Sequence, residues 1–410
     1  MRPRRIGTEE RRARLAHRHR LLPEQRTDDV SRIADDLVAL HSTDPVTVHL
    51  SAMARMRHPS VAAVERALYD ERAVVRHHAM RRTLWVATPD VVRLMHAAAT
   101  RRLVAPEHRR LTTMLADNGV TEPERWLADA REQVLASLAA HGPMTARSLG
   151  TRVPGLRHGL VMAPGKKYSA TVSAHTRVLT LLGFEGRIVR TRPSGSWVSG
   201  AYAYALMEDW LEEGLGGLSE REAACALALR WLRAFGPGTT TDLRWWMGWT
   251  AGTTRTALAD CGAVEVTLDD GPGWLAPGDE EAGTGGDSGP WVALLPSLDP
   301  TTMGWKERGW YLPREAASAF DRMGNAGPTV WVDGEVVGVW AQTAAGELRT
   351  RFFRDPGAER RAEVGRRLEE LASMVGDTRF TVRFPSPAFS ALRASTASAP
   401  PPSEAGPALG

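Results

Sequence analysis

A short polar run, His41-Ser42-Thr43, precedes Asp44 and Pro45 and has the residue types needed to handle a water molecule. A neutral imidazole titrates near working pH and can accept a proton from water. A threonine hydroxyl can orient the same water. In an extended backbone, side chains 41 and 43 point to one side and Ser42 to the other. His41 and Thr43 could therefore act on one water molecule, with Asp44 either orienting His41 or turning the chain.

The same histidine also has a purely structural interpretation. A helix is predicted from four apolar residues at helical spacing, Val30, Ile33, Leu37 and Leu40. That helix must end near Asp44, because the residue before Pro45 is disfavoured in the helical region. A histidine in the last turn of a helix often bonds free carbonyl groups there and interacts favourably with the helix dipole. From the residues alone, the structural interpretation is favoured.

The positive charge of the chain is almost entirely arginine. The net charge is +4, and all but three of the 52 basic residues are arginines. A guanidinium group binds phosphate through two parallel hydrogen bonds, although GC-rich codon usage produces the same excess. The cations predicted to contact DNA are Arg81, Arg82, Lys166, Lys167, Arg187, Arg190 and Arg192. The alternatives are a charged strand edge for the first two and a solvated face for the others.

Several enzyme classes are disfavoured because their motifs are missing from the sequence. It has no phosphate-binding P-loop, no GxGxxG after a strand, no HExxH and no GxSxG. The two cysteines, Cys225 and Cys261, form no CxxC pair, and His77 and His78 lack a third ligand at suitable spacing. We expect no metal and no cofactor. With no apolar stretch of about 20 residues and no secretory signal, we expect a cytoplasmic protein without a membrane segment.

Three segments repeat one order of elements: helices, a short helix pair with a tight turn, and two extended stretches. This order is typical of a helix-turn-helix followed by a wing. We therefore predict an α+β fold with winged-helix units at residues 1–115, 116–212 and 213–290. Ser219 and Glu222 form a capping box at the start of the third unit. Its tryptophans, Trp245, Trp246 and Trp249, are predicted to be core rather than a base-stacking surface.

The last part of the chain, residues 291–386, is predicted to be rich in β-structure. VALLPSLDP begins it as a strand, and TVWVDGEVVGVW is a hairpin with Asp333-Gly334 at its tip. ELRTRFF continues the sheet, a helix follows over residues 358–375, and TRFTVRF returns as a strand. From Pro387 the composition becomes rich in Ser, Ala and Pro, so residues 387–410 are predicted to be a disordered tail.

Five motifs occur in an order that resembles a known family. They are ADDLVALHSTDP, MRRTLW, LRAFGPGTTTDLRWWMGW, LLPSLDPTTMGWKERGWYL and VWVDGEVVGVW. Together they resemble the AlkZ/YcaQ family of winged-helix DNA glycosylases over about residues 10–380. The resemblance implies three tandem winged helices and a β-rich end, arranged as a C-shaped clamp that removes bulky or cross-linked N7-alkylpurines from duplex DNA. The family carries its catalytic residues in a Gln-apolar-Gln or Gln-apolar-Asp motif, at the place where this chain has His41-Ser42-Thr43. The resemblance therefore implies that His41 and Thr43 are catalytic, although both outer residues and the middle residue differ from the motif.

The reaction that the resemblance implies needs little activation of the leaving group. N7-alkylation gives the purine a positive charge, so the base is a good leaving group, and the protein must mainly stabilise an oxocarbenium-like sugar and position water. If His41 accepts the proton of that water, the rate should fall as pH drops through its titration. A role in self-resistance to a DNA-alkylating natural product is one hypothesis for the biology.

Two other functions remain as alternatives. A non-catalytic winged-helix DNA-binding protein would be a regulator or a lesion-shielding factor, but a regulator usually dimerises on symmetric half-sites. Three units in one chain fit a monomeric clamp better. A small-molecule-binding protein is favoured only by the aromatic content.

Overall fold

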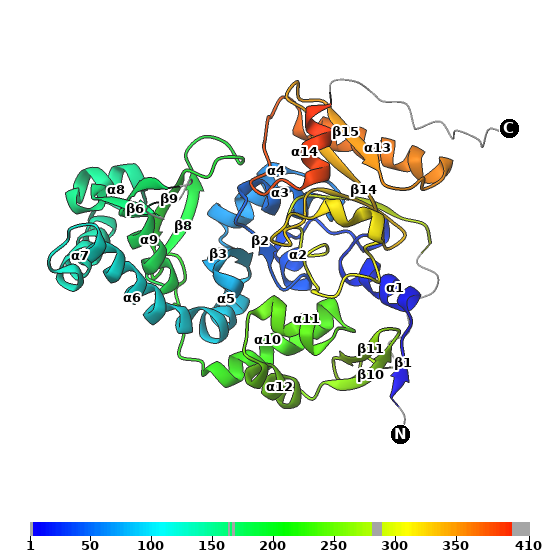
Figure 1. Cartoon of the computed structure of the whole chain (residues 1–410), viewed down its shortest axis with the longest axis horizontal. Helices are drawn as coiled ribbons and strands as arrows, with labels where there is room; N and C mark the ends of the chain where they lie inside the picture. Colours follow the sequence, from blue (N-terminus) through cyan, green and yellow to red (C-terminus); the bar gives the residue numbers. More distant parts are fainter. Residues whose placement is uncertain (1–2, 163–164, 166–168, 281–288, 396–410) are drawn as a thin grey trace.

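The computed structural model describes residues 3–162, 165, 169–280 and 289–395. It is a mixed α+β fold with several small sheets, which agrees with the predicted fold class. Within the described ranges, no helix is long and apolar enough to cross a membrane. Figure 1 shows the N-terminal part of the chain, coloured blue, near the centre of the molecule, with the later parts of the chain around it.

The first part of the chain carries the polar run on a short strand. Its elements are α1 (Thr8–Arg18), η1 (Pro23–Gln25), α2 (Val30–Asp36), β2 (Leu40–His41), α3 (Pro45–Met53), α4 (Val61–Glu65), η2 (Arg66–Asp70), β3 (Val75–His78), η3 (Met80–Arg82), β4 (Leu84–Ala87), α5 (Pro89–Met95) and η4 (His96–Thr100). The sheet order is β2-β4-β3, with His41 opposite Trp85. Strands β3 and β4 pair as an antiparallel hairpin.

The predicted helix before Pro45 is wrong at its end. Helix α2 stops at Asp36, and Val38 has a φ of 62°. Leu40 then pairs with Val86 and His41 with Trp85 as antiparallel strand residues. Pairing with a strand that lies more than 40 residues away therefore overrides the helical spacing of the apolar residues. His41 lies on a strand, so it is not in the last turn of a helix.

The second part lies to one side of the molecule in Figure 1. Its elements are α6 (Arg101–Asp117), α7 (Pro123–His141), β5 (Met144–Thr145), α8 (Ala146–Arg152), η5 (Pro154–Arg157), β6 (Gly159–Met162), β7 (Ala170–Ser173), α9 (His175–Phe184), β8 (Ile188–Pro193) and β9 (Tyr202–Leu206). Helix α7 is followed by Gly142, whose φ is 70°. The β6–β7 hairpin between α8 and α9 was not predicted.

The third part is joined by the start of the chain. Its elements are α10 (Glu220–Phe235), α11 (Thr240–Met247), α12 (Ala251–Asp260), β10 (Val264–Leu268) and β11 (Gly271–Leu275). The Ser219–Glu222 capping box is confirmed. Strand β1 (Arg4–Arg5) pairs in parallel with β10, so these distant segments lie side by side (Figure 1).

The last part is a four-stranded sheet with helices. Its elements are β12 (Val292–Leu295), η6 (Arg314–Ala319), β13 (Thr329–Val332), β14 (Glu335–Gln342), β15 (Leu348–Phe352), α13 (Ala358–Val375) and α14 (Pro387–Ala394). The hairpin turn is confirmed, with φ of 47° at Asp333 and 87° at Gly334. The predicted strand TRFTVRF is wrong, because residues 378–384 form no strand.

Helix α14 also corrects the predicted tail. Disorder was predicted from Pro387, but residues 387–394 are helical and bury Ala388, Phe389 and Leu392. Ser386 caps this helix by accepting a hydrogen bond from the Phe389 N–H. The composition suggested disorder, but one apolar face is enough to fix the helix on the sheet. Residues 396–410 lie outside the described residues.

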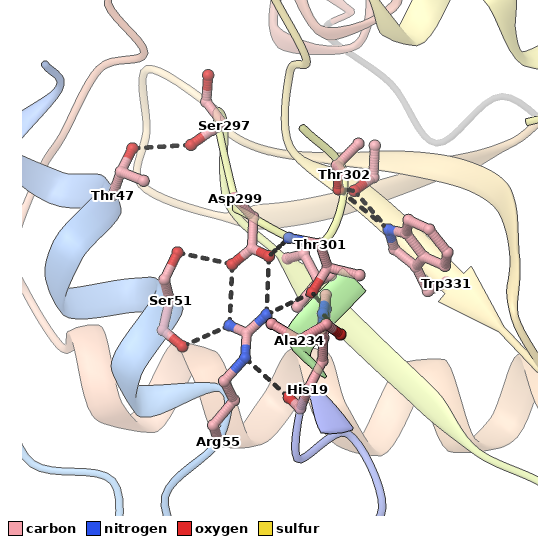
Figure 2. Close-up of polar contacts among 12 residues, drawn as sticks. His19, Thr47, Ser51, Arg55, Ala234, Ser297, Asp299, Thr301, Thr302 and Trp331 are labelled. Carbon is pink, nitrogen blue, oxygen red and sulfur yellow. Dashed lines mark hydrogen bonds and ion pairs between the residues drawn. The ribbon is translucent and has the colours of Figure 1, made fainter. Parts of the chain in front are cut away.

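A buried ion pair ties α3 to the loop after β12, as Figure 2 shows. The Arg55 guanidinium donates to both carboxylate oxygens of Asp299 at 2.9 and 2.8 Å, and both side chains are fully buried. Ser51 on α3 donates to the same carboxylate at 2.6 Å. Arg55 also donates to the carbonyl of His19 at 2.9 Å. Because α3 begins two residues after Thr43, this network fixes the segment that carries the polar run.

Candidate active site

His41 is buried against an aromatic core. Its side chain is 3% exposed, and its ring meets Trp85 edge-on at a centroid distance of 4.7 Å. Trp85 in turn lies 5.3 Å from Trp246 of α11. Trp246 and Trp249 are core residues, as predicted, whereas Trp245 is only half-buried. The site therefore lies where the first hairpin packs on the third part of the chain.

The hydrogen bonds of His41 indicate how its proton is placed. The Thr43 backbone N–H donates to His41 Nδ1 at 3.4 Å. A neutral imidazole that accepts at Nδ1 carries its proton on Nε2. Among the described residues, no group bonds to Nε2. The ring thus has a donor, Nε2–H, left for a water molecule or for DNA.

Burial lowers the pKa of His41 to about 3, and the nearby charge of Arg81 adds to the shift. The expectation that this imidazole titrates near working pH is therefore wrong. A group with so low a pKa stays neutral at any ordinary pH and is a weak base. The arrangement suits a hydrogen-bonding role better than proton transfer.

Thr43 and Asp44 have different surroundings. The Leu84 backbone N–H donates to Thr43 Oγ1 at 3.3 Å, which leaves the hydroxyl one acceptor position and its own proton. The two carboxylate oxygens of Asp44 accept from the backbone N–H groups of Val46 and Arg383 at 3.3 and 3.0 Å. Asp44 makes no hydrogen bond to His41. Of the two roles open to it, the structure favours capping α3.

Arg76 is a site residue that the sequence analysis missed. It is buried, and no described carboxylate forms an ion pair with it. Its Nε donates to Ser42 Oγ at 2.7 Å, its Nη atoms lie 3.4 Å from Tyr69 Oη, and it lies 4.5 Å from the Tyr202 ring. Because a buried cation is costly without such partners, Arg76 and Ser42 hold each other in place. The only signal was a charged residue inside the apolar stretch VVRHH.

Arg81 and Arg82 lie in η3 with φ of 53° and 63°, which is unusual for residues with a side chain. Arg81 lies 4.1 Å over the ring of Trp245, and its charge acts on His41. Arg82 is exposed and forms an ion pair with Glu107. Arg81 is therefore close enough for its charge to act on His41, whereas Arg82 already has an acidic partner.

The cations predicted on and next to strand β8 are not gathered at His41. Arg192 pairs with Glu65 and Asp70 at 3.4 and 2.8 Å. Arg190 lies beside the rings of Tyr202 and Tyr204. Arg187 is exposed and lines a separate groove with residues of α7. Lys166 and Lys167 lie outside the described residues.

One residue of the loop between β8 and β9 is packed inward. Trp197 is only 7% exposed, and its ring contacts those of His49 and Phe380 at 5.3 and 6.2 Å. Ser194, Gly195 and Ser196, at the turn itself, are exposed. Trp197 therefore anchors the loop on the core of the first part, while the turn before it stays open to solvent.

Comparisons with known proteins identify the family. The family model described as "AlkZ-like: DNA glycosylase AlkZ-like" matches residues 34–374. This chain belongs to the AlkZ-like DNA glycosylase family. Within it, the chain acts as a DNA glycosylase, a hydrolase of DNA repair whose substrate is DNA.

One solved structure supports the fold. The Streptomyces sahachiroi DNA glycosylase AlkZ is similar, with a TM-score of 0.68 and 21% sequence identity, over 91% of this chain and 98% of that one. No curated protein sequence matches the chain. In the described part of this AlkZ-like chain, no group of three or more His, Cys, Asp or Glu residues could hold a metal ion.

Proposed function

We propose that this AlkZ-like glycosylase hydrolyses the N-glycosidic bond of bulky N7-alkylated purines in duplex DNA, as a monofunctional enzyme. The observation that carries the proposal is the neutral His41 with a free Nε2–H, beside a Thr43 hydroxyl that can still accept. We further propose that removing such adducts protects the cell from a DNA-alkylating natural product.

His41 and Thr43 together orient one water molecule. His41 Nε2–H donates to the water oxygen, and the water donates one proton to Thr43 Oγ1. One lone pair of the water remains free to attack C1′ of the sugar. The bond between C1′ and the base breaks as the cationic base takes the electron pair and leaves neutral. The added water then loses a proton to solvent, so no strong base is needed.

The low pKa of His41 fits this chemistry. A protonated imidazole would repel both a cationic base and an oxocarbenium-like sugar. Burial keeps the ring uncharged, so it can bond the water without that repulsion. An amide side chain, as in the Gln motif that the family resemblance implies for this place, is also a neutral donor.

We expect the rate of excision to be insensitive to the ionisation of His41 between about pH 5 and pH 8. Its pKa of about 3 means that the neutral, active form is lost only as pH falls toward 3. The test is the single-turnover rate on N7-methylguanine duplex across this range. A sigmoid fall centred near pH 6.5 that disappears in His41→Gln would contradict the positioning role.

DNA binding is proposed to be monomeric, through winged-helix units at residues 1–115, 116–212 and 213–290 that form a C-shaped clamp. Contacts are assigned to the exposed or unpaired cations Arg81, Arg187 and Arg190, with Lys166 and Lys167. For Arg82 and Arg192, binding to phosphate requires exchange of the acidic partners Glu107, Glu65 and Asp70.

Raising salt from 50 to 200 mM should lower the affinity for duplex DNA on the order of 10²-fold. Neutralising about four phosphates gives a slope near −3.6 in a log–log plot. Fluorescence anisotropy with a labelled duplex measures this, and sedimentation gives the stoichiometry. A flat salt response, or a complex of two protein chains on one site, would argue against the clamp.

The function itself is tested by excision. Duplex DNA with one N7-alkylguanine is incubated with the protein, and abasic sites are then cleaved by alkali. We expect cleavage after alkali and none before it, as for a monofunctional enzyme. Tight binding with no abasic sites would instead favour a non-catalytic DNA-binding protein, for which the altered His41-Ser42-Thr43 motif is the supporting observation.

A further inference from the structure

One turn presents an apolar side chain almost wholly to solvent. Met323 is 86% exposed, against 41% for Val161 and 36% for Leu218, the other large apolar residues that stand out in the described part of the chain. A scattered exposed apolar residue is common on protein surfaces. Met323 differs in its degree of exposure and in the rigidity of the turn that carries it.

The turn is fixed by Asp321. Oδ1 of its carboxylate accepts from the backbone N–H groups of Met323 and Asn325, both at 2.8 Å, and Oδ2 accepts from the Asn325 side chain at 2.8 Å. Phe320 and Ala326 form a β-bridge across its base. Met323 is thus held outward by its own backbone.

Two cations lie beside this turn. Arg308 donates to the carbonyl of Gly324 at 3.2 Å, and its guanidinium lies 5.3 Å from the ring of Trp245. Arg81 lies over the same ring at 4.1 Å. In the described residues, neither arginine forms an ion pair with a carboxylate. Burial lowers the pKa of Arg81 to about 10, and the charge of Arg308 contributes. Two neighbouring cations without acidic partners form a place for an anion.

Arg81 links this group to the part of the chain that carries the candidate catalytic residue. Arg81 lies in η3, between β3 and β4. Trp85 on β4 pairs with His41 on β2. The charge of Arg81 reaches His41. The Met323 turn is therefore connected to His41 through Arg308, Trp245 and Arg81.

We propose that Met323 enters the base stack of the duplex next to the lesion, while Arg81 and Arg308 hold a backbone phosphate beside it. The proposal rests on the DNA glycosylase function of this family. Apolar wedges of this kind unstack a base step, and a base must leave its stack before an enzyme can act on it. Trp245 keeps the two guanidinium groups in place by cation–π contact.

The test uses a duplex that contains a tetrahydrofuran abasic-site analogue with 2-aminopurine next to it. Binding of the unchanged protein should raise the 2-aminopurine fluorescence, because the base is unstacked. Met323→Ala should lose most of this rise and bind about tenfold more weakly. Met323→Leu should keep both, and Leu218→Ala, which removes an exposed apolar side chain elsewhere, should behave like the unchanged protein.

The phosphate contact has its own readout. Arg308→Met keeps the packing on Trp245 and Phe320 but removes the charge. It should weaken binding and reduce the salt slope by about 1. Circular dichroism is used to compare the fold of all variants. An unchanged slope would overturn the role of Arg308, and a full fluorescence rise in Met323→Ala would overturn the wedge.

The experiments distinguish a failure of the proposed role of Met323 from a failure of the proposed substrate. If the unchanged protein raises the fluorescence but excises no N7-alkylguanine, the substrate assignment is wrong and the wedge stands. If it excises the base with no fluorescence rise, the wedge is wrong and the substrate assignment stands.

Discussion

His41→Ala is expected to slow single-turnover excision of N7-methylguanine on the order of 10²–10³-fold, the usual effect of removing one fixed hydrogen-bond donor from an active site. The variant loses the Nε2–H that we assign to the attacking water. DNA affinity should change little, because His41 is buried and is not among the proposed phosphate contacts. Residual activity is expected, since the charge on an N7-alkylated base already activates it for departure.

Three further variants sharpen this test. His41→Gln supplies a neutral amide donor at the same place and should keep more activity than His41→Ala. Thr43→Val keeps the shape and removes the hydroxyl, so it should slow excision less than His41→Ala. Arg76→Met removes the hydrogen bond that holds Ser42, so it should slow excision although Arg76 does not contact the water. The decrease in rate should be the same at every pH tested. Unchanged excision by His41→Ala, in protein that binds DNA normally, would show that His41 only fills space beside Trp85.

Asp299→Ala is expected to lower the free energy of unfolding by about 3–5 kcal/mol, the usual cost of leaving one member of a buried ion pair alone. Arg55 would keep its charge at a position with no solvent access, and Ser51 and Thr301 would lose an acceptor. A loss of this size is a large share of the stability of an ordinary protein. Urea denaturation followed by tryptophan fluorescence measures it.

The Arg221–Asp260 pair is the matched control. It has similar two-bond geometry, at 2.7 and 2.8 Å, but Arg221 is exposed. Asp260→Ala should therefore destabilise the protein much less than Asp299→Ala. Replacing both buried partners, as Arg55→Met with Asp299→Leu, should recover part of the loss because no charge is left unpaired. Equal losses for Asp299→Ala and Asp260→Ala would contradict the importance of the buried network.

The two predictions are connected through α3. Ser51 lies on this helix and Arg55 just after it, while Thr43 and Asp44 lead into its first turn. A chain that loses the Asp299 contact and still folds should position His41 and Thr43 less well. Because an error of about 1 Å in position can cost on the order of 10²-fold in rate, Asp299→Ala should reduce excision even where folding is complete.

Elements whose signals lie within a few residues could be predicted from the amino-acid sequence. The Ser219–Glu222 capping box, the Asp333-Gly334 turn and the helix over residues 358–375 are all present as predicted. Such signals are local, because caps and turns depend on neighbours three or four positions away. The ordered motifs also identified the family, and with it the position of His41.

The surroundings of those residues follow from the packing of distant segments and could not be predicted. His41 lies on a strand because β4 pairs with it, and its pKa is low because distant segments bury it. Trp197 fills the core of another part of the chain, and Ser51 meets a carboxylate 248 positions away. Burial and charge pairing depend on groups that packing brings together from anywhere in the chain. No local pattern around His41, Arg76 or Met323 contains that information.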